Sequence, residues 1–176
     1  TVTKGKPSVT DIVVLDSRYT EERIVVLAGS VERKSEHPLS TAIVARVQEM
    51  GLDFAPVEDF RALEGIGVQA RILNEKVSVH KPEKDSQDSK LRALQAEGKT
   101  VVVVEVDGKT AAFIALADTL KDEAVAALAD LRKRGIRTIM LSGDNQIVAN
   151  QIAKEAGIDT VIAEVLPNEK AGKIRE

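Results

Sequence analysis

The 176-residue chain has a net charge of −3, with 25 basic and 28 acidic residues interspersed, and 43% of its residues are apolar. This composition is typical of a globular chain that can bury a sizeable core, and its charge gives no footprint for nucleic acid. With three Phe, one Tyr, no Trp and no Cys, an aromatic base-stacking platform, disulfides, thiol catalysis and cysteine metal sites are excluded.

The first third of the chain predicts a strand and two helices. Residues 9–15, which end in the apolar run 12–15, are expected to form a strand. A helix is expected to begin at Thr20, which is followed by two acids in the first turn, where the helix dipole favours negative charge. A second helix is expected to begin at Pro38, which suits a first turn, and to end at Gly51.

Two hairpins are predicted next. Apolar residues alternate along 68–79, on either side of a turn expected at Asn74-Glu75. The segment 85–97 is polar, and its second half is expected to be helical. The second hairpin covers 100–117 and turns at Asp107-Gly108, a pair that readily adopts the positive φ angles of a two-residue turn. Hairpins in this order predict an antiparallel sheet with helices.

After residue 117 helices and short strands alternate, which is typical of a parallel sheet with crossovers. The expected elements are a helix over 118–135 capped by Asp118-Thr119, a strand over 136–141, a helix ending at Gly157, a strand over 160–163 and a helix from Pro167. The expected fold class is therefore α/β. A doubly wound parallel-sheet domain, incomplete and made of 1–10 and 117–176, receives an inserted α+β domain over 11–116, which is built on an antiparallel sheet.

A candidate anion site follows the strand over 136–141. Ser142, Gly143 and Asp144 lie before a helix, at the carboxyl end of a strand, where ligands bind in doubly wound sheets. A hydroxyl and backbone N–H groups at a helix start suit phosphate, although an ordinary capped loop has the same residues. Lys170 could reach that phosphate as a point charge, or be a solvated surface lysine.

Two further segments are ambiguous by themselves. His37, in SEHPLS (35–40), stands beside Pro38 and is most simply a residue at a helix start. The Gly65-Ile66-Gly67 segment joins two strands, so it does not meet the dinucleotide-binding fingerprint. It permits either a close approach of backbone to a flat ligand or merely a tight bend.

Taken together, six segments resemble, in order, the motifs of the heavy-metal (P1B) branch of the P-type ATPases. They are TVTKG (1–5), similar to the tail of DKTGTLTxG; SEHPLS (35–40), similar to SEHP; EGIGV (64–68), similar to the GxG loop; DTLK (118–121); LSGDN (141–145), similar to TGDN; and LPNEK (166–170), similar to PxxK. The resemblance covers essentially the whole chain.

The resemblance implies a site for ATP or ADP in the inserted domain. By it, His37 contacts the adenine and Glu36 helps to shape the pocket. Gly65, Ile66 and Gly67 form the loop whose backbone lies against the nucleotide.

The resemblance also implies roles in phosphoryl transfer. Thr1 and Thr3 match the threonines that follow the nucleophilic aspartate, and Ser142 replaces a more usual threonine before Gly143-Asp144. Lys170 matches the lysine that neutralises charge on the phosphate. In this family a carboxylate attacks the ATP γ-phosphate with Mg²⁺ present, and an aspartyl phosphate then drives metal transport.

The sequence departs from the family pattern in three places. The DKTG aspartate and the GDGxNDxP segment, which supplies Mg²⁺ ligands, do not occur in the 176 residues. The chain is therefore expected to be a fragment that binds nucleotide without hydrolysing it. His80-Lys81 stands where the family often has a Gly-Asn pair, so the nucleotide affinity could differ.

The resemblance implies the cytosolic part of an integral membrane protein, with transmembrane and actuator domains as partners. The fragment itself is expected to be monomeric. Copper is the first candidate for the transported ion, with zinc, cadmium or cobalt as alternatives. Two other functions are considered: a non-catalytic nucleotide-binding or interaction module, and a haloacid dehalogenase-class phosphatase. SEHP and EGIG argue against the phosphatase, which needs no adenine pocket.

Overall fold

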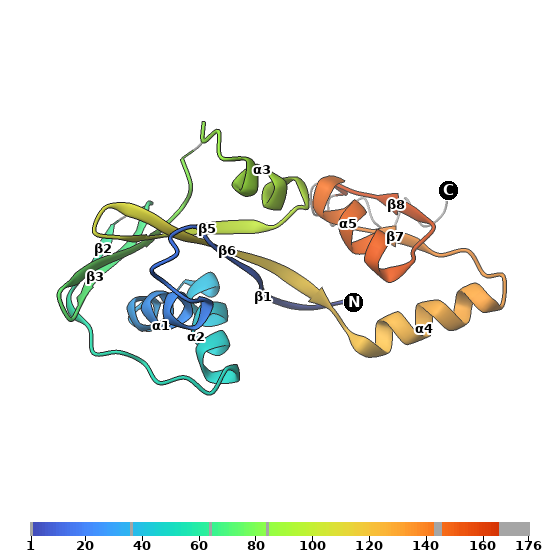
Figure 1. Ribbon diagram of the computed structural model, residues 1–176. Helices are drawn as coiled ribbons and strands as arrows, with labels where there is room; N and C mark the ends of the chain where they lie inside the picture. The colour runs from blue at the N-terminus through green and yellow to red at the C-terminus, as the bar shows by residue number, and fades with distance from the viewer. Residues whose placement is uncertain (1, 36, 64, 84, 143–145, 166–176) are drawn as a thin grey trace. The chain divides into compact units, whose positions relative to one another are not determined.

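The computed structural model describes residues 2–35, 37–63, 65–83, 85–142 and 146–165 (Figure 1). The chain divides into two compact units, which are described separately. The sheet unit consists of Lys6–Gln95 and Lys99–Asp118, and the terminal unit of Thr1–Gly5, Ala96–Gly98 and Thr119–Glu176. None of the helices in the described ranges is long and apolar enough to span a membrane.

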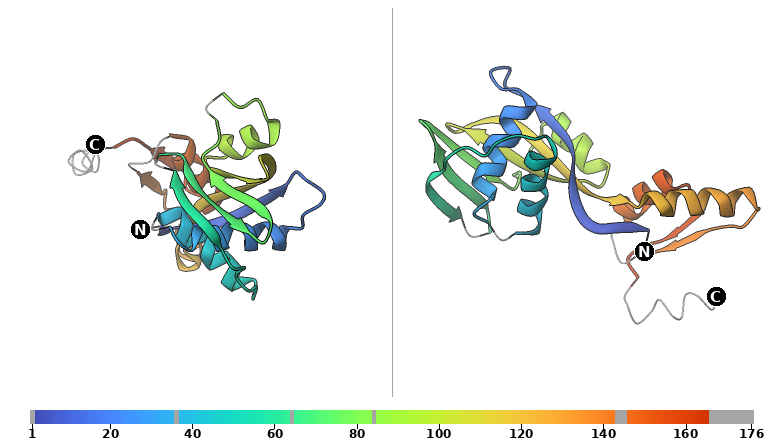
Figure 2. Two further views of the ribbon diagram at one scale, coloured as in Figure 1. Left: turned by 90° about the vertical axis from the view of Figure 1, so that its left-hand side faces the viewer. Right: turned by 90° about the horizontal axis from the view of Figure 1, so that it is seen from below.

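The sheet unit is built on a six-stranded antiparallel sheet with the strand order β1-β6-β5-β4-β3-β2. Its strands are β1 (Thr3–Val14), β2 (Glu58–Leu63), β3 (Gly67–Ile72), β4 (Glu75–His80), β5 (Thr100–Val106) and β6 (Lys109–Leu120). Figures 1 and 2 show α1 (Glu21–Glu32) and α2 (Pro38–Glu49) together on one face, and α3 (Ser89–Ala96) on the other.

Both faces of the sheet are covered, so its central strands are apolar on both sides. In β5, Val102 and Val104 belong to the core beneath α1 and α2. Val101 and Val103 lie between them in sequence and pack with Leu91 of α3 on the opposite face. Side chains that alternate along a strand thus enter two separate apolar clusters.

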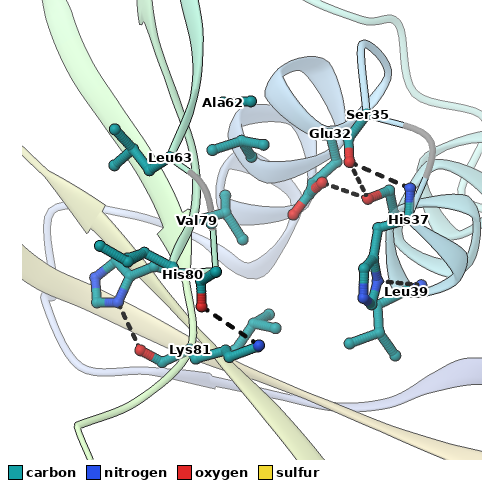
Figure 3. A pocket seen from close by; sticks show the side chains of 15 residues that line it. Glu32, Ser35, His37, Leu39, Ala62, Leu63, Val79, His80 and Lys81 are labelled. Atoms are coloured by element: carbon teal, nitrogen blue, oxygen red, sulfur yellow. Dashed lines mark hydrogen bonds between the residues drawn. The ribbon is translucent and has the colours of Figure 1, made fainter.

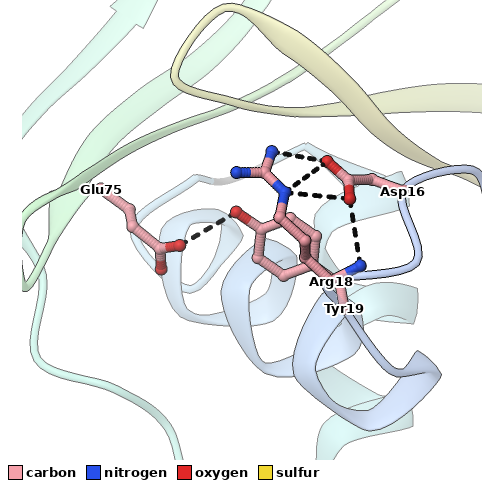
Figure 4. Close-up of polar contacts among 4 residues, drawn as sticks. All are labelled: Asp16, Arg18, Tyr19 and Glu75. Atoms are coloured by element: carbon pink, nitrogen blue, oxygen red, sulfur yellow. Dashed lines mark hydrogen bonds and ion pairs between the residues drawn. The ribbon is translucent and has the colours of Figure 1, made fainter.

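The loop between β1 and α1 is fixed to the start of β4 (Figure 4). The Arg18 guanidinium binds the Asp16 carboxylate at 2.6 Å, and these hydrogen bonds lower the pKa of Asp16 to about 2. The Tyr19 hydroxyl donates to Glu75 Oε1 at 3.0 Å, and Arg23 binds the other Glu75 oxygen at 2.8 Å. These contacts hold the start of α1 against the β3–β4 hairpin.

Several predicted boundaries in this unit agree with the structure. The Thr20 side chain accepts a hydrogen bond from the Arg23 N–H and caps α1. The Asp107-Gly108 turn is also confirmed, with φ angles of 51° and 75°. The other hairpin turns one residue earlier than predicted, because Ile72 pairs with Glu75 and leaves Leu73-Asn74 in the turn. The two strands expected on either side of Gly65-Ile66-Gly67 are β2 and β3, which pair antiparallel.

The terminal unit contains a two-stranded parallel sheet of β7 (Ile139–Leu141) and β8 (Thr160–Ile162). Helices α4 (Asp122–Lys133) and α5 (Gln146–Ala156) accompany these strands. The predicted fold class is confirmed: α/β with a parallel-sheet part and an antiparallel-sheet part. The helix expected at Pro167 lies outside the described residues.

The predicted cap of α4 is wrong. The strand expected to stop at Ala117 continues to Leu120, so Asp118 and Thr119 belong to β6. The N-cap is Lys121, which makes no side-chain capping bond. Its backbone N–H instead donates to Val2 O at 3.0 Å. Pairing with the start of the chain thus extends the strand past the capping signal.

Candidate functional site

Four of the five residues expected to contact nucleotide line one pocket in the sheet unit. A pocket of about 220 Å³ is lined by His37 at the start of α2, by the Gly65-Ile66-Gly67 loop before β3, and by the end of β4 (Figure 3). This volume is smaller than is usual for sites that enclose a drug-sized ligand. The pocket is therefore large enough for one flat ring system, but not for a larger ligand as a whole. Glu36 lies outside the described residues.

His37 is both the N-cap of α2 and a wall of the pocket. Its backbone is extended, with φ −71° and ψ 140°, and its Nδ1 accepts a hydrogen bond from the Leu39 N–H at 3.2 Å. That bond occupies the Nδ1 lone pair, so the neutral ring carries its proton on Nε2. The exposed ring can therefore offer a donor and a flat face to a ligand, and capping does not compete with binding.

Glu32 is a pocket residue that sequence reasoning missed. It is the last residue of α1, is only 7% exposed, and accepts a hydrogen bond from the Ser40 hydroxyl at 2.5 Å. Ser40 Oγ also lies 2.9 Å from Ser35 Oγ. Burial raises the pKa of the Glu32 carboxyl. The available signal was an acid at the negative end of a helix, where the dipole disfavours it.

The raised pKa of Glu32 predicts a pH dependence of stability. Because the folded protein favours the protonated carboxyl, this group contributes stability below its usual pKa of about 4.5, which is lost as the pH rises through the raised value. Glu32→Gln, which stays neutral, should therefore gain stability relative to the parent as the pH rises from 4 to 8. Urea unfolding followed by fluorescence of Tyr19, the only tyrosine, measures this difference. Parallel pH curves for the two proteins would contradict the prediction.

The two glycines of the loop are needed for different reasons. Gly65 has φ +72° and no atom within 4 Å of the position of a Cβ, so its requirement is conformational. Gly67 pairs with His80, and a Cβ there would lie 2.2 Å from Val79 O and 2.6 Å from His80 Cα. The close approach at Gly67 is thus to the neighbouring strand β4. Ile66, between them, is 57% exposed at the rim.

His80, one of the departures from the family pattern, directs its side chain away from His37. It pairs with Val103, whose side chain lies in the cluster under α3, and cross-strand partners point to the same face. Its Nε2 lies 3.4 Å from Glu105 Oε1, and its Nδ1–H donates to Lys81 O at 2.8 Å. The imidazole is therefore held toward the α3 face, where His80 lines a second pocket, and the same residue also borders the pocket beside His37.

The expected phosphorylation residues are mostly outside the described part of the chain. Thr1, Gly143, Asp144 and Lys170 are not described. Thr3 begins β1, and Ser142 follows β7, where its N–H donates to Ile162 O at 2.9 Å and its carbonyl accepts from Val165 N at 3.0 Å. Of this predicted set, the structure thus describes Thr3 and Ser142, and the set as a whole stays a prediction.

The resemblance implies Mg²⁺, with ligands expected mostly outside these 176 residues. Within the ranges described, no three His, Asp or Glu side chains are arranged to hold a metal ion. Magnesium prefers several oxygen ligands in octahedral geometry. No chemical step is therefore derived through the ion.

Comparisons with known proteins cover the whole chain. The profile of the haloacid dehalogenase-like hydrolases matches residues 1–176. A copper-exporting P-type ATPase of Bacillus subtilis (strain 168) is 40% identical over 182 residues, which cover 99% of this chain and 23% of the relative. The chain thus spans about a quarter of the length of that relative.

Two solved structures share the fold. A zinc-transporting PIB-type ATPase in its E2.Pi state matches 98% of this chain and 29% of its own, with a TM-score of 0.89 and 34% identity. The catalytic domain of the CPx-ATPase CopB-B, studied for conformational changes upon nucleotide binding, matches 99% of this chain and 63% of its own. The TM-score of that match is 0.66 and the identity is 26%.

Proposed function

This chain belongs to the haloacid dehalogenase-like hydrolases, and from that premise we propose that it is the nucleotide-binding and phosphorylation region of a heavy-metal-transporting P-type ATPase. Its relatives and structural neighbours are P-type ATPases, so the family resemblance noted in the sequence is confirmed. In this proposal residues 11–116 form the nucleotide-binding domain, and residues 1–10 and 117–176 belong to the phosphorylation domain.

The observation that carries the proposal is the pocket between α2 and the ends of β3 and β4. Segments separated in sequence, SEHPLS and EGIGV, meet there as the nucleotide hypothesis requires. The fold similarity to the catalytic domain of CopB-B supports this assignment, because that domain was studied for its conformational changes upon nucleotide binding.

The chemistry of the pocket suits adenine. The buried Glu32 can accept a hydrogen bond from the exocyclic amino group, and the neutral His37 ring can stack on the purine or donate from Nε2. Val79, 1% exposed, and Ile66 supply apolar surface for the ring. A flat apolar slot with a few polar groups is typical of a site for a small molecule.

In the whole protein, the proposed reaction is in-line attack of an aspartate on the γ-phosphate, followed by hydrolysis of the aspartyl phosphate. In this proposal the attacking aspartate belongs to the DKTG motif, which the 176 residues do not contain, and these residues bind ATP or ADP. Copper is the proposed cargo, after the Bacillus subtilis relative, with zinc as the alternative. The region is cytosolic, with transmembrane and actuator domains as its partners.

The test is calorimetric titration of ATP and ADP into the chain and its His37→Ala variant. We expect binding that is nearly independent of Mg²⁺, and a loss of roughly ten-fold or more in the variant, because both the stacking face and the Nε2 donor are removed. The control is Leu73→Ala, which truncates an exposed side chain outside the pocket and should leave affinity within about two-fold. If neither parent nor variants bind nucleotide, the interaction-module hypothesis replaces this one.

A further inference from the structure

The proposed nucleotide pocket has one cation and one carboxylate among its described lining residues. The cation is Lys81 and the carboxylate is Glu32. Figure 3 shows them well apart, with Glu32 near the top of the view and Lys81 near the bottom. A nucleotide has a neutral base at one end and anionic phosphates at the other, so this separation of charge matches the polarity of such a ligand.

The position of Lys81 is fixed by its backbone. Its N–H donates to Ile66 O at 3.1 Å, and its carbonyl accepts from His80 Nδ1 at 2.8 Å. His80 is itself paired with Glu105. The end of β4 is therefore tied both to the Gly65-Ile66-Gly67 loop and to β5. Because side chains alternate along a strand, Lys81 follows Val79 on the pocket face of the sheet, while His80 between them lies on the other.

The ammonium group of Lys81 is weakly held. In the described part of the chain its recorded polar partner is Gly65 O, at 3.4 Å, and the residue is exposed. A bond of that length is near the limit for a hydrogen bond. The group can therefore leave this carbonyl for an anion at the pocket mouth with little loss of protein–protein interaction.

We propose that Lys81 is a specificity-determining residue that binds the phosphates of the nucleotide, so that this chain distinguishes nucleotides from nucleosides by charge. The inference rests on the proposed nucleotide-binding function. An ammonium acts on phosphate as a point charge, whereas the family's Gly-Asn pair is neutral. The gain is expected to be specific to phosphorylated ligands and to weaken with added salt.

The experiment titrates ATP, ADP and adenosine into the 176-residue chain and its Lys81→Gln variant, at low and high salt. Lys81→Gln should weaken ATP binding roughly three- to ten-fold at low salt, less at high salt, and leave adenosine binding unchanged. The matched control is Lys76→Gln, which removes the same charge from an exposed residue of β4, the strand that Lys81 follows, outside this pocket. Its ATP affinity should equal that of the parent.

Three results would overturn the inference, and they differ from one another. If Lys81→Gln binds ATP as the parent does, while His37→Ala does not, the nucleotide site stands and Lys81 has no part in it. If adenosine binding falls along with ATP binding, Lys81 acts by shaping the loop through Gly65. If no ligand binds the parent, the proposed function fails and the inference with it. Equal urea midpoints for all variants establish that each is folded.

Discussion

Replacing Gly67 with alanine is expected to destabilise the sheet unit by about 3 kcal/mol, because the new Cβ overlaps backbone that cannot rotate away. The position of that Cβ lies 2.2 Å from Val79 O and 2.6 Å from His80 Cα. Relief requires β3 and β4 to move apart, which lengthens the hydrogen bonds of a central strand pair. Urea unfolding followed by Tyr19 fluorescence measures the loss, since Tyr19 lies in the sheet unit.

The control for this experiment is the other glycine of the same loop. Gly65→Ala adds a Cβ into open space and has to tolerate only a φ of +72°, which costs roughly 1 kcal/mol for a residue other than glycine. The two variants thus separate steric overlap from conformational strain two residues apart. Equal losses of stability would show that β4 yields to the extra methyl group and that the pairing is not tight.

Truncating Ile24 to alanine is expected to lower the free energy of unfolding by about 3 kcal/mol. The Ile24 side chain is 0% exposed and packs in the cluster between α1 and the sheet. Removing it deletes apolar contacts and leaves a cavity that surrounding side chains only partly fill. The midpoint of urea unfolding should fall, while the dependence of stability on urea concentration should stay the same.

Leu73→Ala is the matched control for this truncation, because Leu73 is 72% exposed at the tip of the β3–β4 hairpin. Its loss should cost less than about 0.5 kcal/mol, as is usual at surface positions. A comparable loss from both variants would mean that the hairpin tip packs against another part of the protein. The Ile24→Ala protein should still bind ATP where it remains folded, since Ile24 does not line the pocket.

The sequence predicted those turns and helix ends that depend only on neighbouring residues. Asp107-Gly108 makes its own turn, and Thr20 caps its own helix, so each could be read without knowledge of the rest. The cap at Thr119 could not be read in this way. The same residues can begin a helix or continue a strand, and a hydrogen bond from Lys121 to Val2, at the other end of the chain, decides between them.

The pocket was predicted in outline and missed in one important part. The motifs identified His37 and the Gly65-Ile66-Gly67 loop, because these residues are unusual where they stand. Glu32 is an ordinary helical residue by type, and its role depends on burial against Ser40, which only the packing of α1 on α2 creates. The face on which His80 lies likewise depends on its register with Val103.

The position of β1 at the edge of the sheet determines when the fold can be completed on the ribosome. β1 is synthesised first, yet its neighbour in the sheet is β6, the last strand of the unit. Thr10 Oγ1 contacts Ala115 O, 105 residues later in the chain. At translation rates of about 5–20 residues per second, β1 has to wait on the order of 5–20 s for this partner. Closing so long a loop is a slow kind of folding step. An edge strand that stays unpaired for that time can pair with the wrong strand or be bound by a chaperone.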